Sequence, residues 1–279
     1  MGAKILEFDQ AAREKIRAGV QKLALPILGM GGIKRPLPRM MAALGWLVHE
    51  VPFHFRVLHP HRFFREARIL RRSRALTLAC DALAWTGAGW LGARAAQLRA
   101  PLPSSIKGVQ VTCEDDFGSW ADEVWEKSAP HYRFVGERTG RLLRTLYPVT
   151  DPRWIRLTVR KDSTVLGWAL LLCTDCRGHK QFGNLRLGSI ADCLAPPEHA
   201  LAVVSAASAE LQRRGADLLV TNQTHGEWNA ALHRSGFVKG PSNFVFAVSP
   251  KQATTLFPDG PKFDEVHMNR GDGDGPINL

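Results

Sequence analysis

LRLGSIADCLAPPEHALAVVSAASAELQRRGADLLVTNQTHGEWNAALHRSGFVKGPSNFVFAV, residues 185–248, is the stretch that decides the fold. Its first ten residues alternate between apolar and polar, which is typical of a strand with one buried face. From Pro196 to Gly215 the apolar period lengthens to three or four residues, which predicts a helix of about four turns. Residues 217–224 and 243–250 again resemble strands, and a short helix ending at Gly236 separates them. The first strand, helix and second strand therefore predict a right-handed βαβ unit.

The residues before this stretch predict one strand, two helices and two further strands. The strands are KGVQVTC (107–113), WIRLTVR (154–160) and TVLGWALLLCT (164–174), and the helices are DDFGSWADEVWEKSA (115–129) and GERTGRLLRTLY (136–147). From residue 107 to 250 this order resembles the GNAT (GCN5-related N-acetyltransferase) family, with DDFGSWADEVW similar to its first helix and NAALHRSGF to its late helix. The resemblance implies an α/β fold, with a mixed, mainly antiparallel twisted sheet flanked by helices and an additional N-terminal helical region.

A second copy of the last helix and strand lies near the start of the chain. Residues 38–46 align with 229–237, and the strand pattern Phe-x-Phe-x-Val then occurs at 53–57 and again at 244–248. The alternative is chance similarity between two amphipathic segments. If the repeat is real, the resemblance implies that 36–60 is the remnant of a first GNAT-like repeat. Because half a domain would expose strand edges, we expect residues 53–58 to pair with the main sheet or with another chain.

Composition divides the chain into four segments. Residues 2–24 resemble the N-terminus of a group I chaperonin, but no nucleotide-binding loop follows and we assign them no function. The Gly- and Pro-rich residues 25–38 predict a linker or loop. The predicted organisation is therefore an N-terminal helix and linker (1–35), the repeat remnant with a basic helical connector (36–100), the GNAT-like domain (107–250) and a tail (251–279). PLPSS at 101–105 predicts a second linker. In the tail, endings of tandem GNAT proteins imply that Arg270 and Asp272 line the cleft.

The net charge of +11 is concentrated in the N-terminal half. Twelve basic and three acidic residues lie between Lys34 and Arg99, so residues 56–74 predict either a solvated face or contact with an anionic partner. Asp81 and Arg94 interrupt the apolar residues 75–98, which favours a surface-lying helix over a transmembrane segment. An odd number of cysteines, five, and no secretory leader predict reduced thiols and a cytoplasmic protein.

The resemblance also implies a cofactor, acetyl-CoA or another acyl-CoA. In the family its pyrophosphate binds the loop after the fourth strand, which corresponds here to residues 192–199. The predicted cofactor-binding residues are Cys193, Leu194, Ala195, His199 and Asn222. The loop departs from the family pattern because it has no glycine, two prolines remove N–H donors, and Glu198 adds a negative charge. The two alternatives are retained acyl-CoA binding and a degenerate, structural domain.

Four residues are candidates for acid-base catalysis. Asp192 or His225 would take the proton from an attacking amine, with Glu227 nearby and His233 replacing the tyrosine acid common in the family. The alternative is that Asp192, His225 and Glu227 cap helices. Cys173, Cys176 and His179 are too few for a structural zinc site, and we predict a thiol-containing hairpin without a metal.

Two classes of function follow. The first is an N-acyltransferase that moves an acyl group from acyl-CoA to an amine of a small molecule or sugar. The second is a non-catalytic GNAT-like module whose basic N-terminal half binds a partner, an anionic surface or RNA. Aminoacyl transfer from charged tRNA is a third hypothesis, and homo-oligomerisation is left open.

Overall fold

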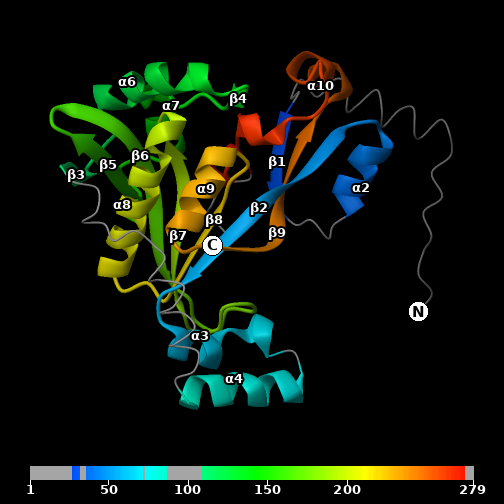
Figure 1. Ribbon diagram of the computed structural model, residues 1–279, viewed down its shortest axis with the longest axis vertical. Coiled ribbons are helices and arrows are strands. Elements are labelled where there is room, and N and C mark those ends of the chain that lie inside the picture. Colours follow the sequence, from blue (N-terminus) through cyan, green and yellow to red (C-terminus); the bar gives the residue numbers. More distant parts are fainter. Residues whose placement is uncertain (1–26, 32–35, 72, 87–107, 274–279) are drawn as a thin grey trace.

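The computed structural model describes residues 27–31, 36–71, 73–86 and 108–273, which build one eight-stranded sheet with helices on both faces (Figure 1). The strand order is β1-β9-β2-β8-β7-β6-β5-β3. The strands are β1 (Ile27–Gly31), β2 (Leu47–Val57), β3 (Val109–Glu114), β5 (Ile155–Lys161), β6 (Thr164–Asp175), β7 (Arg186–Leu194), β8 (Leu218–Asn222) and β9 (Val238–Val248). All neighbours are antiparallel except β7 and β8. The predicted mixed, mainly antiparallel α/β sheet is therefore confirmed.

Helices cover the two faces of the sheet around β6. Successive residues of a strand point to opposite faces. Gly167 faces Val203 of α8 (Ala200–Arg213), because a Cβ on this glycine would lie 2.8 Å from that side chain. Trp168 instead meets Phe117, which leads into α6 (Ser119–Ser128), with ring centroids 5.7 Å apart. One core therefore extends through both layers. None of the described helices has the length and apolar run that a bilayer crossing requires.

The predicted βαβ unit is present as β7, α8 and β8. Pro196 precedes a 3-10 turn that begins at Pro197 (Pro197–His199), so the regular helix begins only at Ala200. The next predicted helix and strand are α9 (Gly226–Arg234) and β9. Strand β9 begins five residues before the predicted residue 243, since Val238–Gly240 pair with Phe53–Phe55 of β2. That pairing is long-range, and local periodicity does not reveal it.

Strand β2 is inserted between β8 and β9. It pairs with β8 from Phe53–Asn222 to Val57–Leu218, which confirms the expectation that residues 53–58 join the main sheet. Its first half pairs with β9 from Leu47–Val248 to Val51–Phe244. Both edges of β2 are therefore hydrogen-bonded, and residues 47–57 share one sheet with the strands of residues 107–250.

The two similar sequence segments also match in structure. Helices α2 (Pro36–Ala43) and α9 each lead to a glycine with positive φ, 83° at Gly45 and 80° at Gly236. Each is followed by an 11-residue strand, β2 or β9, and then by a short helix that begins with proline, α3 (Pro60–Glu66) or α10 (Pro250–Leu256). The pairing of β1 with β9 corresponds to that of β8 with β2. Descent of this segment from a lost GNAT-like repeat stays a prediction.

The interpretation of residues 25–38 as a linker is wrong where the structure describes them. Residues 27–31 form β1, and α2 begins at Pro36. Strand β1 forms because β9 supplies a hydrogen-bonding edge, and tertiary pairing overrides the low strand propensity of glycine. Gly29 is needed there, since a Cβ would lie 2.6 Å from the Asp272 carbonyl oxygen and 2.7 Å from the Phe244 ring.

The basic connector predicted at 61–100 is helical as far as it is described. It contains most of α3, a 3-10 turn (Arg68–Leu70) and α4 (Arg74–Thr86). The chaperonin-like residues 2–24, the predicted linker 101–105 and the rest of the connector lie outside the described residues. In the tail, α10 is followed by residues that return to the sheet and are taken up below.

Phe246 of β9 tests the packing of β1 and β2 on this strand. It is fully buried in a cluster with Val51, Phe257 and Met268, so Phe246→Ala should lower the free energy of unfolding by about 3–5 kcal/mol. Val238→Ala is the control in the same strand, because Val238 is 52% exposed and its truncation should change stability by less than about 0.5 kcal/mol. Urea denaturation measures both, and equal losses would contradict this packing.

Candidate functional site

The two parallel strands β7 and β8 separate before they end. They pair only from Leu187–Leu218 to Ser189–Val220, and the hydroxyl of Thr221 then donates to the Ile190 carbonyl at 3.0 Å. Beyond this point β7 continues to Leu194 without pairing with β8. In open α/β sheets, ligands bind where the carboxyl ends of parallel strands separate. The crevice between residues 191–195 and 222–225 is therefore the candidate site.

The C-terminal segment, residues 263–273, reaches into this crevice. Its strand β10 (Val266–His267) pairs in parallel with β4 (Phe134–Val135), which precedes α7 (Gly140–Leu146). The His267 Nε2 donates to the Cys193 carbonyl at the end of β7, at 2.8 Å. The Met268 N–H donates to the Thr224 hydroxyl beyond β8 at 2.9 Å, and the Thr224 N–H donates back to the Met268 carbonyl at 3.2 Å. The segment thus bridges both sides of the crevice.

Three aromatic side chains lie around His267 of the bridging segment: Tyr132, Trp228 and His225. The Tyr132 hydroxyl donates to the Ala195 carbonyl at 2.5 Å and accepts from the Trp228 indole at 2.8 Å. The Tyr132 ring stacks on His267 at 4.8 Å and meets His225 edge-on at 4.9 Å. Burial lowers the pKa of His225, and it lowers the pKa of His267 well below its usual value. Burial likewise raises the pKa of Tyr132, so all three side chains are neutral near pH 7.

A buried ion cluster lies beside the aromatic group. The Arg138 guanidinium donates to an Asp192 oxygen at 2.9 Å, to an Asp272 oxygen at 2.7 Å and to the Gly136 carbonyl at 2.7 Å. Asp192 also accepts from Asn269 at 2.9 Å and from the Tyr147 hydroxyl at 3.3 Å. Every polar group of this cluster that would lose water therefore gains a partner in the protein.

The pKa shifts in the cluster follow from burial and from its charges. Burial raises the pKa of Asp192, the positive charge of Arg138 opposes this, and the negative charge of Asp272 adds to it. Burial disfavours the charged guanidinium, yet the two carboxylates outweigh this effect and raise the pKa of Arg138 well above its usual value. The cation is thus held between two carboxylates in a site closed to water.

The structure brings two of the four predicted catalytic residues to the crevice. Asp192 lies there fully buried and bonded, which suits it to position neighbours rather than to meet a substrate. His225 caps α9 by accepting from the Glu227 N–H at 3.2 Å, which confirms the capping alternative for this residue. Glu227 is exposed on the first turn of α9. His233 is on its last turn and meets His54 of β2 edge-on at 5.5 Å, so α9 places it at the opposite end from the crevice.

The predicted cofactor-binding residues are divided between two places. Cys193, Leu194 and Ala195 are buried at the end of β7, and the Cys193 N–H already donates to Asp192 at 2.8 Å. His199 ends the 3-10 turn before α8, only partly buried. Asn222 instead donates to the Val51 carbonyl of β2 at 3.4 Å. Cys193, Leu194 and Ala195 therefore line the β7 side of the crevice, whereas Asn222 ends β8 on the other side and its side chain bonds to the inserted strand β2.

Sequence reasoning missed Arg138, Tyr132 and His267. No local pattern marks these three residues, because their partners are distant in sequence. The one indication in the sequence is the tail, since its resemblance to the endings of tandem GNAT proteins predicts that Asp272 lines the cleft. Arg270 of the same tail is buried, with its guanidinium 5.3 Å from the Phe244 ring centroid.

The β6–β7 hairpin carries the Cys-x-x-Cys-x-x-His sequence. The His179 Nδ1 accepts from the backbone of Gln181 and of Phe182, both at 3.2 Å, and so stabilises the turn. Within the described part of the chain, no three His, Cys, Asp or Glu side chains are grouped to hold a metal ion.

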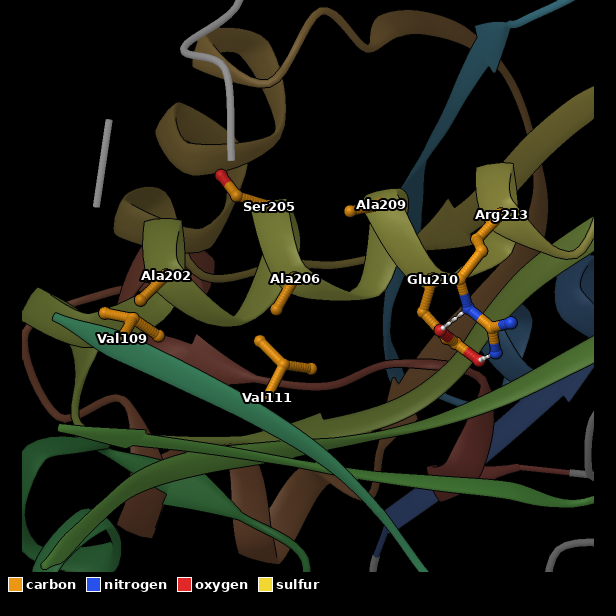
Figure 2. Close-up of a pocket in the computed structure, with 8 residues that line it drawn as sticks. All are labelled: Val109, Val111, Ala202, Ser205, Ala206, Ala209, Glu210 and Arg213. Atoms are coloured by element: carbon orange, nitrogen blue, oxygen red, sulfur yellow. Dashed lines mark hydrogen bonds and ion pairs between the residues drawn. The ribbon is translucent and has the colours of Figure 1, made fainter. Parts of the chain in front are cut away.

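A separate groove of about 340 Å³ lies between β3 and α8 (Figure 2). Val109, Val111, Ala202 and Ala206 face it, and Glu210 closes one end with its ion pair to Arg213. Hydrogen bonds from neighbouring arginines lower the pKa of Glu210 to about 2. Strand β3 is the sheet edge, three strands from β7, so this groove is not part of the crevice.

No known family model matches the chain, and no curated protein is detectably similar in sequence. Solved structures with a similar fold include a GCN5-related N-acetyltransferase from Kribbella flavida, with TM-score 0.44, 12% identity and coverage of 87% of this chain and 77% of that one. They also include Saccharomyces cerevisiae N-myristoyltransferase with bound myristoyl-CoA and inhibitors, with TM-score 0.44, 10% identity and coverage of 77% of this chain and 56% of that one. A third is a tandem GNAT protein from the clavulanic acid biosynthesis pathway, with TM-score 0.42, 14% identity and coverage of 91% of this chain and 70% of that one. All three similarities are of fold, at TM-scores below 0.5 and low sequence identity.

Replacement of Arg138 by methionine tests the ion cluster. Without the guanidinium, Asp192 and Asp272 remain buried near each other with no cation, so Arg138→Met should lower the free energy of unfolding by about 3–5 kcal/mol. The deficit should shrink in acid, where protonation of a carboxylate removes the repulsion. Arg153→Met is the control, because Arg153 pairs with Asp151 at the surface, and should leave stability unchanged. Chemical denaturation at pH 7.5 and 5 measures both variants.

Because His54 is buried, we expect the free energy of unfolding to fall in weak acid. Burial, with His233 and Lys239 nearby, lowers its pKa from 6.5 to about 4 in the folded chain. Between these values the unfolded chain binds the proton and the folded chain does not, so stability is complete above pH 6.5 and falls as the pH drops towards 4. His54→Gln should flatten this slope in urea titrations, whereas exposed His131→Gln should not. Equal slopes in wild type and His54→Gln would refute the assignment.

Proposed function

We propose that this protein is an acyl-CoA-dependent N-acyltransferase whose reaction takes place in the crevice between β7 and β8. The observation that carries the proposal is the separation of these two parallel strands after Ser189, with buried polar and aromatic side chains converging on their ends. The acceptor in this proposal is the amine of a small molecule or sugar. The similar folds of acyltransferases are consistent with it but do not identify a substrate.

The chemistry needs a base and a donor of hydrogen bonds. In the proposed reaction the amine attacks the thioester carbonyl, a C–N bond forms, the C–S bond breaks, and the amine proton passes through a base to the CoA thiolate. His267 suits the base better than His225, because its ring is neutral and its buried Nδ1 has no partner among the described residues. The Nδ1 of His225 is engaged in the helix cap. Backbone N–H groups at the end of β7 would face the developing oxyanion.

The donor site fits acyl-CoA only in part. The backbone of Leu194 and Ala195 could hold the pantetheine and the thioester end. Pro196 and Pro197 remove two phosphate-binding N–H groups, and exposed Glu198 disfavours an anion. In addition, Val266–Asp272 lies in the crevice, so the proposed reaction requires this segment to shift and make room for the thioester while His267 stays beside the strand ends.

Thr224 offers a test of this movement. Its hydroxyl donates to the Val266 carbonyl and accepts from the Met268 N–H, so Thr224→Val removes two bonds that hold the segment while it preserves shape. If acyl-CoA competes with the segment, the variant should bind acetyl-CoA or a longer acyl-CoA about 5- to 30-fold more tightly than wild type in calorimetric titration. Thr254→Val, on the exposed face of α10, is the matched control and should bind like wild type.

Absence of acyl-CoA binding in both wild type and Thr224→Val, at millimolar ligand and with the fold verified by circular dichroism, would refute the acyltransferase proposal.

One observation favours the second candidate, a non-catalytic GNAT-like module. The described C-terminal segment already satisfies the Cys193 carbonyl, the Thr224 N–H and Asp192, which are groups that a ligand would otherwise meet.

A further inference from the structure

Helix α4 is apolar on nearly every side and yet lies at the surface. Among residues 74–85, whose burial the structure describes, only Cys80 is buried, whereas Leu76 is 50%, Leu78 71% and Trp85 91% exposed. Figure 1 shows α4 as the outermost element at the lower end of the molecule, beyond α3. A helix that is apolar all round is normally covered by protein or lipid. The exposed face of α4 therefore requires a partner.

Helix α4 is held firmly in this place. Phe63 and Ala67 of the preceding segment pack on Phe182 and Leu185 of the β6–β7 hairpin. The hairpin also bonds to this segment: Arg68 donates to the Gly178 carbonyl at 3.3 Å, and Asn184 donates to Glu66 at 3.0 Å. Arg71 then binds Asp81 of α4 itself at 2.9 Å. The outward position of the apolar residues thus follows from specific contacts on the inner side of the helix.

Positive charge surrounds the exposed apolar residues. Two acids lie on α3 and α4: Glu66, which Arg65 and Asn184 engage, and Asp81, which Arg71 engages. Five exposed cations lie on α3, on the 3-10 turn, on α4 and on the β6–β7 hairpin that holds them, and they form the rim: Arg65, Arg68, Arg74, Arg177 and Lys180. The last three make no ion pair with any described residue. The local field is therefore positive, and it attracts an anionic partner.

We propose that this α4 surface, formed by Leu78 and Trp85, which lie seven residues apart and so share one side of the helix, with the rim of five cations, docks on the surface of an anionic phospholipid bilayer. Helices that lie in a membrane interface combine leucine and tryptophan with flanking cations. The helix is about 20 Å long at 1.5 Å per residue, and it lies flat in this arrangement. Nucleic acid accounts for the cations but offers nothing to the exposed Leu78 and Trp85 side chains, so lipid fits the whole surface better.

The docking surface lies at the opposite end of the sheet from the crevice. Strand β7 begins next to the hairpin that holds α3 and ends at Leu194 in the crevice. Docking through α4 therefore leaves the crevice open to the aqueous side. This inference stands whether or not the chain transfers acyl groups.

Co-sedimentation of the full chain with sucrose-loaded vesicles tests the proposal. The chain should bind vesicles of phosphatidylcholine with phosphatidylglycerol at least tenfold more strongly than pure phosphatidylcholine, and high salt should weaken this binding. Leu78→Asp with Trp85→Asp should abolish it. Leu146→Asp with Val149→Asp, at positions 51% and 56% exposed elsewhere on the surface, is the matched control and should bind like wild type. Arg65→Gln with Arg74→Gln should weaken binding about fivefold per arginine.

Three results would overturn the proposal. The first is no binding to anionic vesicles by a folded chain. The second is equal binding by wild type and the Leu78→Asp, Trp85→Asp variant. The third is a wild-type dimer in sedimentation velocity that the same variant converts to a monomer, since α4 would then be covered by a second copy of the chain. Circular dichroism verifies that each variant is folded.

Discussion

The guanidinium of Arg138 fixes the part of the structure that holds the candidate site. A buried cation without partners is unfavourable by several kcal/mol or more, so the segments that supply its acceptors must meet around it. They are the loop at Gly136, strand β7 through Asp192, and the C-terminal segment through Asp272. The approach is close enough to require glycine: a Cβ at Gly136 would lie 2.5 Å from an Asp272 oxygen, and one at Gly271 2.5 Å from an Asp192 oxygen. One charge thereby joins residues that are far apart in sequence.

This constraint explains why the crevice is closed on one side. The bond between Asp272 and Arg138 fixes the end of the C-terminal segment beside β7. Residues 266–269, which come just before it, therefore lie between the two strand ends. There His267 donates to the Cys193 carbonyl and Met268 donates to the Thr224 hydroxyl. The ends of two parallel strands that separate would otherwise expose backbone groups to each other across a gap. The segment satisfies these groups. A ligand for the crevice must therefore offer better partners than the chain itself does.

Prediction from sequence succeeded where the signal is local. The period of two in 185–194 and of three to four after Pro197 identifies β7 and α8 because burial of one face determines each pattern. The repeat of Phe53 and Phe55 in Phe244 and Phe246 even predicted the pairing of β2, since a strand like β9 needs two edges covered. Strand β1 was missed because its glycine reflects contact with Asp272, a residue more than two hundred positions away, and no local pattern encodes that contact.

The candidate site was only partly predictable for the same reason. Asp192 and His225 stand at strand ends, which sequence can locate, but their roles depend on partners that it cannot. His225 is a helix cap because the N–H of Glu227 points at it, and Asp192 is a counterion because Arg138 comes from another segment. Arg138 and His267 lack any motif, so only the folded arrangement reveals them.

The direction of β7 and β8 separates the two proposed activities in space. Two parallel strands place all their carboxyl ends at one end of the sheet, so a crevice can form only there. Their amino ends receive the turns from the preceding elements, which are the β6–β7 hairpin and the turn after α8. Asp217 in this second turn holds the start of α3. Asp217 accepts from Arg62 and from the Arg186 N–H, and the Leu58 N–H donates to its carbonyl. The α4 surface is thus attached through contacts that share no residue with the Arg138 cluster. Changes at one end should therefore leave the other intact, because mutations at distant sites without shared partners act independently.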